Sequence, residues 1–132
     1  MDKNTGRILV IESDQEIRSL LIDLIKDEGY EADSVEKGTY AFKKLMTDSF
    51  DLIITDIQLP GFSGFDILPA LKKIHPQTPV VVITAFEGAD VYFEARERGA
   101  NAFLEIPIQL KKLRELIHQM LSPRERAVEE VM

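Results

Sequence analysis

Short, nearly uninterrupted runs of apolar residues recur along the chain, separated by longer segments in which apolar residues return every three or four positions. Turn-forming residues bound the runs, which is typical of strands buried on both faces of a sheet. The five predicted strands cover residues 7–11, 30–34, 51–55, 80–84 and 102–106. The second run is the most polar, as expected for a strand near the edge of a sheet.

The segments between the runs have the periodicity of amphipathic helices. Ser13 or Asp14 is the predicted cap of the first helix, and Gly29 is its predicted end. The other four helices are predicted at about residues 36–48, 64–75, 89–98 and 109–121. Residues predicted to face the core from these helices include Leu20, Met46 and Ile74.

Strands and helices therefore alternate five times. Alternation with continuous apolar strands predicts a parallel sheet with helices on both faces. The fold class is α/β, a doubly wound (βα)5 five-stranded parallel sheet in a flavodoxin-like three-layer sandwich.

Composition narrows the functional classes. The chain has 132 residues, 45% of them hydrophobic, which suits one domain. It has no cysteine, so disulfides and thiolate metal sites are excluded. With 16 basic and 23 acidic residues the net charge is −7, which disfavours binding to a phosphate backbone. No apolar run is long enough for a membrane span or signal peptide, so a cytoplasmic protein is expected.

Polar residues follow the predicted strands at their carboxyl ends, which lie along one rim of a parallel sheet. Asp56 ends the apolar run of residues 51–55 and precedes the Pro60-Gly61 turn, while Glu12 and Thr84 end two other strands. Ligand sites of open α/β folds lie at this rim. An isolated aspartate would merely cap a turn, but two carboxylates with a hydroxyl suit a hard cation such as Mg²⁺.

These segments resemble the receiver domains of bacterial two-component response regulators, over residues 7–121. The segments that carry the resemblance are ILVIESD at 8–14, LIITDIQLPG at 52–61 with Gly64, VITA at 82–85 and GANAF at 99–103. Each is weak alone, and together they are specific.

The resemblance implies a site around Asp56. In that family the matching aspartate accepts a phosphoryl group from a histidine kinase or phosphotransfer protein. Mg²⁺ is held by that aspartate, by an acidic pair matched by Glu12 and Ser13, and by the backbone carbonyl matched by Gln58. The hydroxyl matched by Thr84 bonds the phosphoryl group.

The resemblance also implies a switch. An aromatic residue matched by Phe103 turns inward as the last two helices and the fifth strand rearrange. The added charge of about −1.5 to −2 is sufficient to bias a two-state loop. The bond before Pro107 is expected to be cis, as it usually is in the family.

The chain departs from the family pattern at two positions. Ser13 replaces the second acid, which weakens the expected Mg²⁺ site. Ile106 replaces the lysine that pairs with the acceptor, and an isoleucine cannot make a charge-assisted bond. Glu105 has the wrong sign, and Lys111 and Lys112 belong to the last helix.

Three alternatives to the phosphorelay receiver remain. The first is a pseudo-receiver that acts as an interaction module without phosphorylation. The second is a Mg²⁺-dependent phosphatase, which would need a general acid where Gln58 stands. The third, a flavodoxin-like cofactor binder, would need a run of Gly, Ser and Thr after the first strand, and that run is missing.

The predicted domain covers residues 1–121. In the segment 122–132, Ser122-Pro123-Arg124-Glu125 forms a capping box, so a linker helix is expected to start there. The expected partners are a histidine kinase or phosphotransfer protein, an output domain or partner protein, and a second copy through the last two helices and the fifth strand. His75 and His118 are predicted to be solvent-facing residues of helices.

Overall fold

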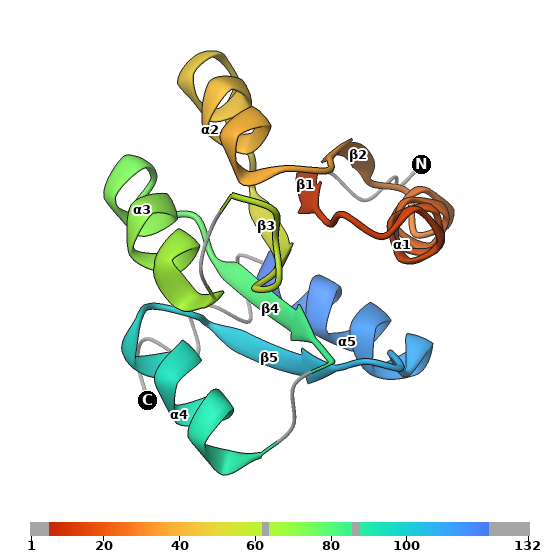
Figure 1. Cartoon of the computed structure of the whole chain (residues 1–132). Helices are drawn as coiled ribbons and strands as arrows, with labels where there is room; N and C mark the ends of the chain where they lie inside the picture. Colours follow the sequence, from red (N-terminus) through yellow and green to blue (C-terminus); the bar gives the residue numbers. More distant parts are fainter. Residues whose placement is uncertain (1–5, 62–63, 86–87, 122–132) are drawn as a thin grey trace, which may run out of the picture.

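The computed structural model describes residues 6–61, 64–85 and 88–121. It contains a five-stranded parallel sheet with the strand order β2-β1-β3-β4-β5. The strands are β1 (Arg7–Ile11), β2 (Glu31–Val35), β3 (Leu52–Asp56), β4 (Val80–Thr84) and β5 (Ala102–Glu105). The predicted fold class is confirmed, and the polar strand β2 lies at an edge of the sheet (Figure 1). The predicted linker helix after residue 121 lies outside the described residues.

Helices follow the strands in the predicted order. Their bounds are α1 (Gln15–Asp27), α2 (Gly38–Thr47), α3 (Ile67–Ile74), α4 (Ala89–Glu97) and α5 (Leu110–Leu121), with a 3-10 turn η1 (Gly64–Asp66) before α3. Asp14 is the N-cap of α1, and its carboxylate accepts a hydrogen bond from the Ile17 amide at 3.1 Å. No helix in the described ranges is long and apolar enough to cross a membrane.

The sheet separates two hydrophobic clusters. Alternate strand residues point to opposite faces, so Ile8 and Leu9 are both fully buried but belong to different clusters. One cluster packs beneath α1 and α5, and the other beneath α2, α3 and α4 (Figure 1). Burial on both faces explains why the central strands β1, β3 and β4 are apolar without interruption.

The α4–β5 side of the sheet is less buried than the centre of the sheet, as the edge strand β2 also is. In α4 the buried residue is Ala95, and in β5 no residue is buried. In β3 and β4, by contrast, every residue is buried. The sheet therefore has a well-packed centre and a lightly packed edge at β5.

Three residues predicted to face the core are exposed instead. Leu20, Met46 and Ile74 have relative exposures of 42%, 79% and 41%. Leu20 precedes the buried Leu21, and Met46 follows the buried Leu45. Adjacent residues of a helix point in directions about 100° apart, so the neighbour of a buried residue can face solvent. Ile74 is the last residue of α3. The apolar spacing therefore overestimates the width of the buried stripe.

Both histidines are partly exposed, as predicted, but their rings also contact partners on other elements, which the sequence does not predict. Nδ1 of His118 lies 2.8 Å from the Tyr30 hydroxyl, and Nε2 lies 2.6 Å from Oε1 of Glu28. Nε2 of His75 lies 2.9 Å from the Leu45 carbonyl oxygen. The helical pattern predicts which side of a helix is apolar, but it does not predict polar partners from other elements.

The Tyr30–His118 bond provides a test of how much this connection stabilises α5. Replacing Tyr30 by Phe removes the hydroxyl and retains the buried ring, so we expect a loss of about 1 kcal/mol of unfolding free energy. Chemical denaturation measures it. Tyr40→Phe is the matched control, because Tyr40 is 42% exposed, and we expect a change within about 0.5 kcal/mol. Equal changes in the two variants would contradict a stabilising role for the bond.

Candidate functional site

The predicted rim residues lie on three adjacent strands in the middle of the sheet. Asp56 is the last residue of β3, Thr84 is the last residue of β4, and Glu12 directly follows β1. All three side chains are buried, with exposures of 5%, 0% and 1%. The structure therefore brings together, at one rim, the groups that the sequence predicts. Their burial is unusual, because buried carboxylates are rare unless they are paired or bind a cation.

Short-range hydrogen bonds orient Asp56. Oδ1 of its carboxylate accepts a hydrogen bond from the Gln58 amide at 2.9 Å. The Thr55 hydroxyl donates to the Asp56 carbonyl at 2.8 Å. Beyond Gln58 the chain turns at Gly61, whose φ of +84° lies in the left-handed region that favours glycine. The end of β3 and this turn therefore present one carboxylate at the rim.

Glu12 is held by contacts with three different segments. Its amide donates to the Val35 carbonyl at 3.1 Å, and Oε2 accepts from the Asp14 amide at 3.0 Å. Its carbonyl oxygen accepts from Nη1 of Arg18 at 2.7 Å. Oε1 is buried and has no partner in hydrogen-bond geometry among the described residues. The backbone and one carboxylate oxygen are thus fixed, and the other oxygen is available to a ligand.

The electrostatics of Glu12 match this geometry. Burial raises the pKa of Glu12 from its ordinary value of 4.5 to about 8. The negative charges of Asp56 and Asp14 add to the rise, as does a hydrogen bond that protonated Glu12 makes to the Asp56 carboxylate. The hydrogen bond from the Asp14 amide opposes it. Two carboxylates near each other cannot both ionise readily without a proton or cation between them. Near neutral pH Glu12 therefore holds a proton when no cation is bound.

The donor set suits Mg²⁺, which binds proteins through one or two carboxylates and keeps several waters. The available ligands are the carboxylates of Glu12 and Asp56 and the backbone carbonyl of Gln58. The partnerless Oε1 of Glu12 is the observation that fits a cation. Ser13 is exposed and offers a hydroxyl where a further carboxylate would increase the negative charge. Accordingly, within the described ranges no group of three His, Cys, Asp or Glu side chains is arranged to hold a metal.

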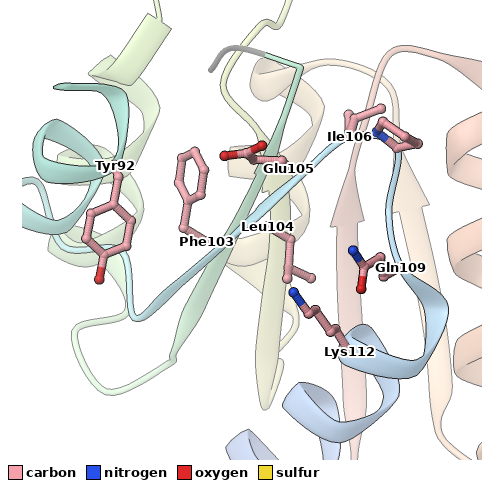
Figure 2. Close-up of a pocket in the computed structure, with 8 residues that line it drawn as sticks. Tyr92, Phe103, Leu104, Glu105, Ile106, Gln109 and Lys112 are labelled. Atoms are coloured by element: carbon pink, nitrogen blue, oxygen red, sulfur yellow. The ribbon is translucent and has the colours of Figure 1, made fainter. Parts of the chain in front are cut away.

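The end of β5 reaches the same rim without a positive charge. The Ile106 amide donates to the Thr84 carbonyl at 2.8 Å, and the Ile106-Pro107 bond is cis, as expected. In Figure 2, Lys112 extends from α5 on the Leu104 side of β5, away from Phe103 and Glu105. No lysine within the described residues is seen to replace the missing one at position 106.

Phe103 lies on the α4 side of β5. Its ring meets that of Tyr92 edge to face, with centroids 5.8 Å apart and planes at 82°. The two rings line one side of a pocket of about 570 Å³ that curves around β5 to Ile106, Gln109 and Lys112 (Figure 2). The predicted switch residue therefore occupies the lightly packed edge of the sheet.

Sequence reasoning missed Arg18. This partly buried residue lies in the first turn of α1, and its bond to the Glu12 carbonyl depends on the path of the loop between β1 and α1. Nothing in the spacing of apolar residues predicts such a contact.

Known proteins share this arrangement. The family model of the response regulator receiver domain matches residues 8–118. The response regulator protein PilR from Pseudomonas aeruginosa is 35% identical over 124 residues, which is 94% of this chain and 28% of PilR. FleR from the same organism is 30% identical over 112 residues, which is 85% of this chain and 24% of FleR. The chain thus spans about a quarter of these relatives.

Solved structures agree with the sequence comparisons. The receiver domain of a putative LuxO repressor protein from Vibrio parahaemolyticus superposes with a TM-score of 0.84 at 30% identity, covering 96% of this chain and 97% of that one. NtrX from Brucella abortus gives a TM-score of 0.85 at 29% identity, covering 96% of this chain and 29% of NtrX. The family model and the relatives agree, and the chain belongs to the response regulator receiver domain family of two-component signalling.

Proposed function

We propose that this receiver domain is a phosphoryl-accepting switch in which Asp56 takes a phosphoryl group from a histidine kinase or phosphotransfer protein. The observation that carries the proposal is the buried Glu12–Asp56 pair with an unpartnered carboxylate oxygen. Burying two carboxylates costs stability, and the local hydrogen bonds that each accepts offset only part of this cost. The pair suits a site that receives a cation and a phosphoryl group.

In the proposed reaction, a carboxylate oxygen of Asp56 attacks the phosphorus of a phosphohistidine. A P–O bond forms, the P–N bond breaks, and the imidazole leaves with the electron pair and takes up a proton. The Gln58 amide holds the Asp56 carboxylate in place during the attack. Bound Mg²⁺ would supply positive charge to the phosphoryl oxygens.

The proposed response starts at Thr84 and ends at the β5 edge. The Thr84 hydroxyl bonds a phosphoryl oxygen, Phe103 turns inward, and α4, β5 and α5 rearrange. The loose packing of β5 supports this proposal, because few buried contacts oppose the movement. We propose that this face contacts an output domain, a partner protein or a second copy of the chain. We also propose that the domain acts in the cytoplasm and does not itself bind nucleic acid.

A second candidate is a pseudo-receiver that binds partners without phosphorylation. Ile106 and Ser13 favour it, because they remove a cation and an acid from the rim. The two candidates make opposite predictions about Asp56. The family is one of signalling modules, so no turnover is proposed beyond phosphorylation and dephosphorylation of Asp56.

Incubation with acetyl phosphate and Mg²⁺ separates the two candidates. We expect intact-protein mass spectrometry to show the addition of one phosphoryl group, which is lost in Asp56→Asn. Asp51→Asn is the matched control, since Asp51 is an exposed aspartate at the opposite end of β3, and it should be modified like the parent. If the parent gains no mass, and beryllofluoride with Mg²⁺ leaves its NMR spectrum unchanged, the pseudo-receiver candidate replaces the switch.

A further inference from the structure

Arg18 connects α1 to the loop that carries the acidic rim residues. Its Nη1 atom donates to the Glu12 carbonyl at 2.7 Å and approaches the Ser13 carbonyl at 3.4 Å. Both acceptors are backbone groups of the segment between β1 and α1. One guanidinium thus fixes consecutive peptide units beside the site.

Other arginines with side-chain partners in the described residues serve different places. Arg7 bonds Asp33 near the start of the sheet, Arg98 joins α4 to Asp66, and Arg114 lies 3.5 Å from Glu28. Each of these bonds ends on a carboxylate. Arg18 instead donates to the backbone carbonyl of a site residue, Glu12. Because the guanidinium is charged, this bond belongs to the stronger, charge-assisted kind of hydrogen bond.

The Arg18 bond completes the set of contacts that determine the orientation of Glu12. The Val35 carbonyl holds the Glu12 amide, and the Asp14 amide holds Oε2. Without Arg18 the loop after Glu12 loses an anchor, so the Asp14 amide that holds Oε2 can shift and release the Glu12 carboxylate. With Arg18, Oε1 is the buried Glu12 oxygen left for a ligand.

We propose that Arg18 is a positioning residue of the site, which holds the Glu12 and Ser13 backbone so that the Glu12 carboxylate faces Asp56. The inference rests on the proposed function, because it concerns the Mg²⁺ site of that function. Groups that orient metal ligands typically alter metal affinity by about 10- to 100-fold when they are removed. Arg18 matters more here than in a site with three carboxylates, because only two are present to be positioned.

Positioning and simple charge predict opposite results when Arg18 is neutralised. A guanidinium near the site repels Mg²⁺, so loss of its charge alone would strengthen Mg²⁺ binding. Loss of its hydrogen bonds would misplace Glu12 and weaken binding. The sign of the change in affinity therefore distinguishes the two roles.

The test is a Mg²⁺ titration of the whole chain by isothermal titration calorimetry at low ionic strength. Arg18→Met keeps the aliphatic stem and removes the donors, and we expect about tenfold weaker Mg²⁺ binding. Arg18→Lys restores a cationic donor and should recover most of the loss. Lys26→Met, which neutralises a basic residue in the last turn of the same helix, should match the parent.

Mg²⁺ affinity that is equal or stronger in Arg18→Met overturns the positioning role, whatever Asp56→Asn does. If Asp56→Asn leaves affinity unchanged while Arg18→Met weakens it, the proposed metal site at Asp56 fails and Arg18 still positions Glu12. Thermal unfolding without Mg²⁺ shows whether each variant is folded. Should Arg18→Met not fold, Arg18→Gln, whose amide is too short to reach the carbonyls, replaces it with the same expected outcomes.

Discussion

Replacing Ile106 by Lys is expected to raise the rate at which acetyl phosphate phosphorylates Asp56 by about 10- to 100-fold. The Ile106 amide bonds the Thr84 carbonyl, so Ile106 lies beside the end of β4, the strand that pairs on its other side with the Asp56 strand β3. A lysine there would provide a charge-assisted bond to the transferred group, and such bonds contribute about 1.5–3 kcal/mol. Since each 1.4 kcal/mol changes a rate about tenfold, the expected gain follows.

The controls for this variant separate charge from side-chain shape. Ile106→Met has a long unbranched side chain without charge and should keep the rate of the parent. Combining Ile106→Lys with Asp56→Asn should abolish the mass increase, because the lysine acts on a group carried by Asp56. Time courses by intact-protein mass spectrometry give the rates. Equal rates for the Lys and Met variants would show that the missing charge does not limit phosphorylation.

The second large effect is a loss of stability as pH rises, caused by Glu12. Its pKa is about 8 in the folded chain and returns to about its ordinary value of 4.5 when the chain unfolds. Between these values the folded chain binds the extra proton, so the unfolding free energy falls with increasing pH. The stabilisation is fully present below about pH 4.5 and is lost as pH rises through about 8.

The size of this effect is measured by comparison with Glu12→Gln. Glutamine remains neutral at all pH values and keeps an oxygen that accepts from the Asp14 amide. We expect the parent to lose about 4 kcal/mol relative to this variant between about pH 5 and pH 9, in chelator at constant ionic strength. Denaturant titrations followed by circular dichroism give both curves. Parallel curves would mean that Glu12 ionises normally in the folded chain.

The sequence predicts the sheet well because burial on both faces leaves little choice of residue in β1, β3 and β4. The rim residues Glu12 and Asp56 are predictable for a related reason, since every parallel strand ends at the same edge. The alternation of strands and helices thus determines both fold class and site.

Features that depend on contacts between distant elements are less predictable. The exposure of Met46 depends on how wide a stripe of α2 the sheet covers, which the spacing of apolar residues does not give. The partners of His118 and Arg18 depend on the packing of α5 against the segment between α1 and β2 and on the loop after β1. In each case the exposure or the contact partner of the residue is determined only when the helices and strands pack against one another.

The uneven packing of the sheet has a consequence for how a signal leaves the rim. Asp56 is carried by a strand that is buried throughout, whereas the neighbouring edge at β5 and α4 has few buried residues. Local opening in proteins begins where burial is least, so this edge opens at a lower free energy than the strand that bears the acceptor. In the proposed switch the acceptor therefore lies on the stiff part of the sheet and the responding face on a part that opens more easily, so that local opening of this face leaves the geometry around Asp56 intact.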